Sequence, residues 1–151
     1  MTEHTTEGGC LCGAVRFRTE GRSLFCAHCH CQWCRQAHGA AFVTWYGVKA
    51  EAFRLTQGED RLRWYASSEK SERGFCATCG TTMFFRSSCA AGEVHVALAC
   101  ADGPIDRAPA AHVFYEAHVP WVVLGDDLPR YDRDAASLAK YQAVPRSPPR
   151  R

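Results

Sequence analysis

The chain has 151 residues, which suits a single domain with room for a hydrophobic core. Hydrophobic residues make up 46% and charged residues 23%, which is typical of a globular protein and excludes a largely disordered chain. The net charge is only +2, and no apolar run approaches the roughly 18 residues of a membrane-spanning helix, so no membrane partner is expected.

The strands expected along the chain are short and separated by turn signals. Residues 14–18 alternate, with Val15 and Phe17 on one face, and residues 41–48 are rich in aromatic and β-branched side chains. Further strands are expected at residues 52–56, 62–65, 81–86, 93–99 and 112–117. Strands of this length and spacing favour antiparallel sheets in a sandwich or an open barrel. The sequence therefore predicts a mainly β fold.

Helix is expected in two places only. One short turn follows Cys34, and residues 135–141 form a second helix with Asp134 as its N-cap.

The C-terminal part differs from the rest in charge. From Leu128 onward six basic residues face two acidic ones, a local charge of +4. We predict a folded domain over residues 1–131 and a basic, proline-rich, partly disordered tail over residues 132–151. The basic residues are too sparse for a phosphate-binding patch, so a nucleic-acid partner is not expected.

The cysteine content raises the question of function. The chain has 10 cysteines, and its first residues are polar, without the apolar stretch of a secretory signal peptide. In a secreted chain these cysteines would form a disulfide framework, whereas thiols stay reduced inside the cell. We therefore expect a cytoplasmic protein whose cysteines bind a metal or take part in catalysis.

Two cysteine pairs far apart in the sequence could share one metal ion. They are Cys10 with Cys12 and Cys76 with Cys79. Structural zinc takes four ligands in a tetrahedron, which the two pairs supply, and amides in such turns can donate to the thiolates. The rival reading is a thioredoxin-type redox motif, which needs a helix at the motif, but residues 81–86 read as a strand. The sequence therefore predicts a structural zinc site.

A third cluster, Cys29, Cys31 and Cys34, supplies three thiolates within six residues. Three protein ligands with a fourth position for water or substrate are typical of a catalytic zinc. A fourth protein ligand would instead make the site structural, and the spacing leaves both arrangements open. The candidates for that ligand are Cys26, His28, His30, His38, His95 and His112.

Six stretches carry a resemblance to a known family. They are GCLCGAV (9–15), CHCQWCR (29–35), GAAF (39–42), GFCATCGT (74–81), HVF (112–114) and PW (120–121). In these stretches the chain resembles the glutathione-dependent formaldehyde-activating enzymes, whose domain is shared with centromere protein V. The resemblance runs from about residue 8 to residue 131, with seven cysteines in matching order and spacing.

The resemblance implies an Mss4-like fold, with short antiparallel sheets organised around zinc. It also implies two zinc sites with the division of ligands described above. We expect the zinc of the second, incomplete site to be the more labile of the two. Their ligands would be Cys10, Cys12, Cys76 and Cys79 for the structural zinc, and Cys29, Cys31 and Cys34 for the second, catalytic zinc. The family's named reaction joins glutathione to formaldehyde to give S-hydroxymethylglutathione, formally the reverse of a carbon–sulfur lyase step.

The partners implied are a small thiol, with glutathione as cosubstrate, and an aldehyde-type substrate. The carboxylates of glutathione would need cations, for which sequence proximity suggests Arg35, Lys70 and Arg73. A fold does not fix a function, so two other functions are retained. One is a non-catalytic zinc module that binds a protein or nucleic-acid partner. The other is a thiol-stress protein that exchanges a loosely held zinc.

Overall fold

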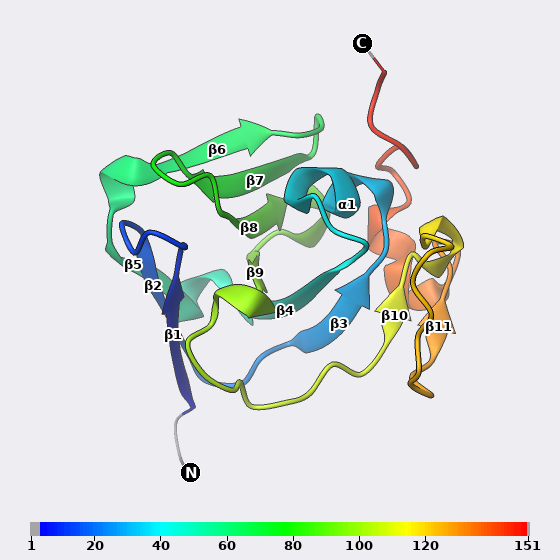
Figure 1. The fold of residues 1–151 in the computed structure, drawn as a ribbon, viewed down its shortest axis with the longest axis horizontal. Helices are drawn as coiled ribbons and strands as arrows, with labels where there is room; N and C mark the ends of the chain where they lie inside the picture. The colour runs from blue at the N-terminus through cyan, green and yellow to red at the C-terminus, as the bar shows by residue number, and fades with distance from the viewer. Residues whose placement is uncertain (1–3, 151) are drawn as a thin grey trace.

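The alternating pattern of the sequence folds into two sheets (Figure 1). The structure is a computed structural model that describes residues 4–150, and this part contains eleven strands, one α-helix and six 3-10 segments. The mainly β fold that the sequence predicts is confirmed. No helix in the described part is long and apolar enough to cross a membrane.

The smaller sheet is antiparallel and contains the first strand of the described residues. In spatial order its strands are β1 (Thr5–Gly9), β2 (Arg16–Glu20) and β5 (Phe53–Gln57).

The larger sheet has eight strands and curves around the core (Figure 1). In spatial order they are β11 (Arg130–Tyr131), β10 (His112–Val113), β3 (Phe25–Cys29), β4 (Val43–Lys49), β9 (Glu93–Ala97), β8 (Thr82–Ser87), β7 (Ser71–Cys76) and β6 (Leu62–Ala66). β10 pairs in parallel with β3 and with β11, so this sheet is not wholly antiparallel as expected.

The helical segments are short and lie between strands or after the last one. They are α1 (Gln32–His38), η1 (Ala50–Ala52), η2 (Glu59–Arg61), η3 (Ser88–Ala90), η4 (Leu98–Cys100), η5 (Tyr115–Ala117) and η6 (Ala136–Tyr141).

The main core lies where the two sheets face each other. Phe17 of β2 and Phe84 of β8 are fully buried, and their ring centroids are 5.3 Å apart in an edge-on arrangement. Phe53 of β5 approaches Phe84 to 4.9 Å. A second buried cluster, built around Cys29, Cys34 and Trp45, lies towards β3 and α1.

Replacing Phe84 with alanine tests how strongly the main core holds the sheets together. Because the ring is fully buried between Phe17 and Phe53, the variant should lose about 3–5 kcal/mol of unfolding free energy. Urea denaturation measures this loss. Phe84→Leu, which keeps most of the apolar volume, should lose clearly less, and equal losses in the two variants would contradict the packing assigned to this ring.

Two predicted elements end differently in the structure. The strand expected at residues 112–117 covers only β10, because Phe114 adopts a left-handed backbone conformation with φ of 52° and the chain continues into η5. The helix expected at residues 135–141 is the 3-10 segment η6. Its N-cap is Ala135, without a side-chain cap, so Asp134 does not cap it.

Strands β1, β3, β7 and the two-residue β11 are not predicted by the alternation pattern. The sequence of β1 is polar, and it becomes a strand through its antiparallel pairing with β2, which buries Thr6. β3 and β7 lie within the larger sheet, each between two neighbouring strands. Such strands are specified by their partners rather than by an alternating surface.

Candidate functional site

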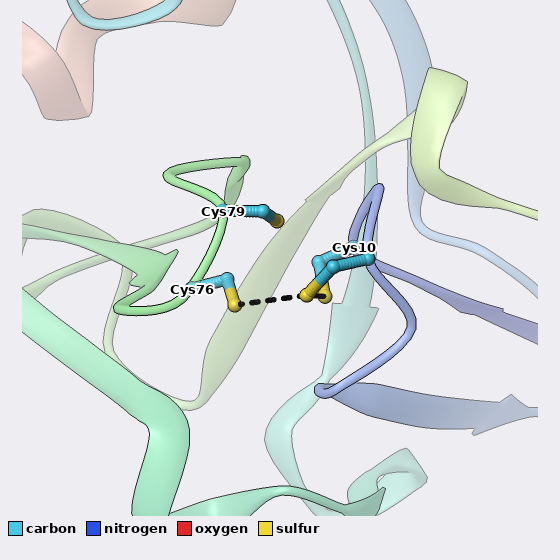
Figure 2. A group of neighbouring side chains, drawn as sticks. Cys10, Cys76 and Cys79 are labelled. Carbon is cyan, nitrogen blue, oxygen red and sulfur yellow. Dashed lines mark hydrogen bonds between the residues drawn. The ribbon is translucent and has the colours of Figure 1, made fainter.

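The two distant cysteine pairs meet at one point. Cys10 and Cys12 lie between β1 and β2, and Cys76 and Cys79 lie at the turn from β7 to β8; Figure 2 shows Cys10, Cys76 and Cys79 from these two segments. The four Sγ atoms all lie within 4.8 Å of one another. Cys12 Sγ is 3.6 Å from Cys10 Sγ and 3.8 Å from Cys76 Sγ. Tetrahedral zinc with bonds of about 2.3 Å spaces its sulfurs about 3.8 Å apart, so this group fits the ion.

Nearby donors join the two cysteine loops and stabilise their negative charge. The amide of Val15 donates to Cys10 Sγ at 3.3 Å, and the amide of Leu11 donates to the Thr81 hydroxyl at 3.0 Å. The Thr81 hydroxyl lies 3.2 Å from Cys79 Sγ, and this hydrogen bond and the Thr81 amide lower the pKa of Cys79 to about 5. Cys79 is therefore a thiolate at neutral pH, the form in which cysteine binds zinc.

The second cysteine group lies where β3 passes into α1. Cys29 is the last residue of β3, Cys31 is the N-cap of α1 and Cys34 lies in the helix. Their three Sγ atoms lie within 4.8 Å of one another, with 3.6 Å between the sulfurs of Cys29 and Cys34. The Cys34 amide donates to Cys31 Sγ at 3.3 Å, so the capping of the helix also positions a sulfur. This spacing fits zinc as well.

A buried arginine stands beside this group. Arg73 of β7 is 6% exposed, its Nη1 donates to Cys34 Sγ at 3.7 Å, and its guanidinium lies 5.1 Å from the centre of the Phe85 ring. Hydrogen bonds from the Cys29 and Cys31 thiols, together with the charge of Arg73, hold the pKa of Cys34 well below its usual range. The Nε of Arg73 is buried without a hydrogen-bond partner.

None of the six candidates for a fourth ligand belongs to the three-sulfur group within residues 4–150. Burial raises the pKa of Cys26 to about 11, so its thiol stays protonated at neutral pH. His28 Nδ1 lies 2.7 Å from Thr44 Oγ1, and His95 Nε2 lies 3.0 Å from Glu93 Oε2. These side chains are engaged elsewhere in the fold.

A buried polar chain fastens the cysteine loop to β10, and the spacing of the sequence does not predict it. His30 Nε2 lies 2.8 Å from His112 Nδ1, and His112 Nε2 lies 2.9 Å from an Asp126 oxygen. The Asp126 carboxylate can only accept, so His112 donates to it through Nε2, and the facing nitrogens of His30 and His112 share the other hydrogen bond. Burial lowers the pKa of His30 to about 4, which keeps that ring neutral. This hydrogen-bonded series of His30, His112 and Asp126 holds the loop that bears Cys29 and Cys31.

A cavity of about 400 Å³ opens beside the second cysteine group and includes all three of its cysteines in its lining. β3, β4 and β8 contribute Phe25, Trp45 and Phe85 to its wall. The C-terminal segment also contributes to the lining, with Leu138, Tyr141 and Val144 among its residues. This segment passes close to the end of β10, where the ring centroids of Phe114 and Tyr141 are 6.2 Å apart. Figure 1 shows its backbone near β10 and β11. There Trp33 Nε1 donates to the carbonyl of Pro145 at 2.8 Å, which ties α1 to this segment.

The three cations suggested by sequence proximity lie in different places. Arg73 lines the cavity. Lys70 is exposed, and neither it nor Arg35 belongs to the cavity lining. The Nε of Arg35 donates to the carbonyl of His30 at 3.3 Å, so this side chain supports the cysteine loop from outside.

The fold and the site define a mainly β protein with two separate cysteine groups that could hold zinc. Comparison with known protein families shows which family the chain belongs to. The family described as "Glutathione-dependent formaldehyde-activating enzyme" matches residues 5–117, and the chain belongs to this family.

Two individual proteins are also similar. An uncharacterised lyase of Schizosaccharomyces pombe is 37% identical over 86 residues, which are 52% of this chain and 56% of the relative. The chain thus matches little more than half the length of this relative. A crystal structure of a Rhodobacter sphaeroides protein is similar with a TM-score of 0.55 and 22% identity, covering 82% of this chain and 98% of the other. This likeness supports the fold.

Proposed function

We propose that the chain is a zinc-dependent enzyme of the carbon–sulfur lyase type that makes or breaks the bond between a thiol sulfur and a carbonyl-derived carbon. The family's named reaction, in which glutathione and formaldehyde give S-hydroxymethylglutathione, is one example of this chemistry. Cys10, Cys12, Cys76 and Cys79 would hold a structural zinc, and Cys29, Cys31 and Cys34 a second, catalytic zinc. The natural setting is the cytoplasm, where thiols stay reduced.

One observation carries this proposal: the three-sulfur group and the cavity coincide. The four-sulfur group lies between two loops and supplies a complete ligand set from the protein. The three-sulfur group lines a cavity of about 400 Å³, and no histidine or further cysteine of the described residues joins it. Three protein ligands beside a substrate-sized space suit a catalytic zinc rather than a structural one.

The residues around the second group have separable roles. The three cysteines would hold the ion, and the zinc, when bound, supplies a positive charge that favours the thiolate form of an arriving thiol. Arg73 balances the negative charge of the cysteines through Cys34 Sγ, and because it also lines the cavity its guanidinium can donate to an oxygen of the substrate. The polar chain from His30 to Asp126 keeps the cysteine loop in place.

The bond changes balance without an oxidant or a reductant. In the cleavage direction the carbon–sulfur bond breaks, its electron pair stays on sulfur, and the hydroxyl of the adduct becomes a carbonyl as its proton passes to the departing sulfur or to water. In the opposite direction the thiol gives up its proton to water, the sulfur attacks the carbonyl carbon, and the oxygen takes up a proton from water. Arg73 lies beside the cysteine group, where it can stabilise the oxygen as its charge changes.

Cobalt substitution tests this proposal. Adding 2-mercaptoethanol to the cobalt-loaded protein should change the thiolate-to-metal absorption band, whereas ethylene glycol, with a hydroxyl in place of the thiol, should not, because the site is soft. Cys89→Ser, outside both cysteine groups, should respond like the wild type. A band indifferent to millimolar thiol would contradict the enzyme and favour a non-catalytic zinc module.

A further inference from the structure

The lining of the cavity beside Cys29, Cys31 and Cys34 is mostly apolar and rich in rings. Its aromatic members are Phe25, Trp33, Trp45, Phe85, Phe114 and Tyr141. The rings support one another. The centroids of Trp45 and Phe85 are 6.2 Å apart, and so are those of Phe114 and Tyr141. Formaldehyde has about the size of one or two water molecules, each of which occupies about 30 Å³ in the liquid. It would therefore fill a small part of about 400 Å³.

The cations in the lining are already bonded to the protein. Arg107 Nη2 donates to the carbonyl of Ser23 at 2.6 Å, and Arg133 Nη2 donates to the carbonyl of Gln142 at 2.6 Å. Arg133 is also buried. A charged ligand would have to compete with these carbonyl oxygens for the two arginines, and it would lose part of its own hydration on entering the cavity.

Two further cations of the lining are paired with acids. Lys140 Nζ lies 3.2 Å from a Glu93 oxygen, and Arg146 lies 3.4 Å from Asp134. Glu116 also lines the cavity, where it accepts from the Arg133 amide at 2.9 Å and lies 3.7 Å from Arg146, so it takes up part of the charge of that cation. The two carboxylates and the ammonium group of glutathione therefore find few free partners in this lining.

Arg73 differs from these cations because it lines the cavity directly beside the sulfurs and has no carboxylate partner among the ion pairs of the described residues. Its Nη1 is directed to Cys34 Sγ, and its Nε has no partner. One donor beside the sulfurs, within an aromatic wall, suits an adduct with one hydroxyl or carbonyl oxygen and an otherwise uncharged body.

From these contacts we propose that the thiol handled by this site is an uncharged thiol with an apolar, ring-sized body that occupies the aromatic cavity. This inference rests on the proposed function and names its substrate class. The sulfur lies at the cysteine end of the cavity, and the ring packs among Phe25, Trp45 and Phe85. Burying a ring of this size favours binding by a factor of about ten or more over a thiol that lacks it.

Binding to the zinc-loaded protein tests the inference with three thiols. Benzyl mercaptan carries a ring, 2-mercaptoethanol is small and uncharged, and glutathione is large and charged. Quenching of tryptophan fluorescence reports binding, because Trp33 and Trp45 line the cavity. We expect benzyl mercaptan to bind at least about tenfold more tightly than either of the others. Benzyl alcohol, which has the ring without the sulfur, should also bind, although more weakly.

A matched pair of variants separates the cavity from general effects. Ala111 lines the cavity, whereas Ala108, three residues earlier, is exposed and does not. Ala111→Leu should weaken benzyl mercaptan and benzyl alcohol about tenfold while leaving 2-mercaptoethanol unchanged. Ala108→Leu should bind all four ligands like the wild type. Equal weakening by the two variants would overturn the assignment of the ring to this cavity.

The outcomes distinguish this inference from the proposed function. If all three thiols change the cobalt band but glutathione binds as tightly as benzyl mercaptan, the apolar class is overturned and the proposed chemistry stands. If no thiol changes the cobalt band, the proposed function is refuted, and so is the inference that its substrate is an apolar thiol. If benzyl alcohol still bound and Ala111→Leu weakened its binding, the cavity would then be assigned to apolar ligands of another chemistry.

Discussion

Replacing Cys76 with serine should remove one zinc per chain and unfold the protein. Cys76 is fully buried, and its Sγ lies 3.8 Å from that of Cys12, 64 positions away in the sequence. The ion would close this long loop, and structural zinc contributes about 10–16 kcal/mol in small zinc domains. Since a whole domain is stable by only about 5–15 kcal/mol, loss of the ion should abolish the cooperative melting transition. Circular dichroism and metal analysis measure the two effects.

Cys89→Ser is the matched control for this variant. Cys89 is half-buried in η3 and belongs to neither cysteine group. It should keep both zinc ions and melt within about 1 kcal/mol of the wild type. If Cys76→Ser also kept its zinc and its melting temperature, the four-sulfur site would not hold the fold together.

The grouping of the cysteines follows from the sequence because metal ligands come in closely spaced runs. Cys10 with Cys12 and Cys76 with Cys79 each bring two sulfurs to one turn, so two such turns complete a tetrahedron. The structure brings these four sulfurs together and keeps the other group apart. The turn at Cys79 leads into β8, as the strand reading of residues 81–86 requires.

The residues that surround the second cysteine group could not be predicted from the sequence in the same way. His30 meets His112 from 82 positions away, through the parallel pairing of β3 with β10. Neither residue carries a local signal for this contact, and β10 is only two residues long. The cavity likewise combines side chains from the larger sheet with a C-terminal segment for which the sequence predicts partial disorder.

Sequence proximity was also a weak guide to the cations near the site. Arg35 follows Cys34 directly, yet its guanidinium supports the loop from behind through the His30 carbonyl. Arg73 lies 39 positions from Cys34 and reaches its sulfur from β7. The register in which β7 pairs with β6 and β8 determines the face of the sheet on which each side chain of β7 lies. The residues next to Arg73 in the sequence do not indicate this register.

The same reasoning predicts that Cys31→Ser removes the second zinc and leaves the protein folded. Cys31 is half-buried, and the cysteines of its three-sulfur group are at most five positions apart, so the ion closes no long loop. Serine is also a strong N-cap, so its hydroxyl can accept from the Cys34 amide in place of the sulfur and preserve the start of α1.

We therefore expect Cys31→Ser to change the metal content of the protein but not its stability. Metal analysis should show one zinc fewer per chain, and the response of the cobalt band to thiols should disappear. Circular dichroism should show a melting transition within about 1 kcal/mol of the wild type. Cys31→Ala, which loses both the ligand and the N-cap, should cost about 1 kcal/mol more than the serine variant. Global unfolding of Cys31→Ser would instead make the second site structural, because an ion that closes no long loop would then be holding the fold together.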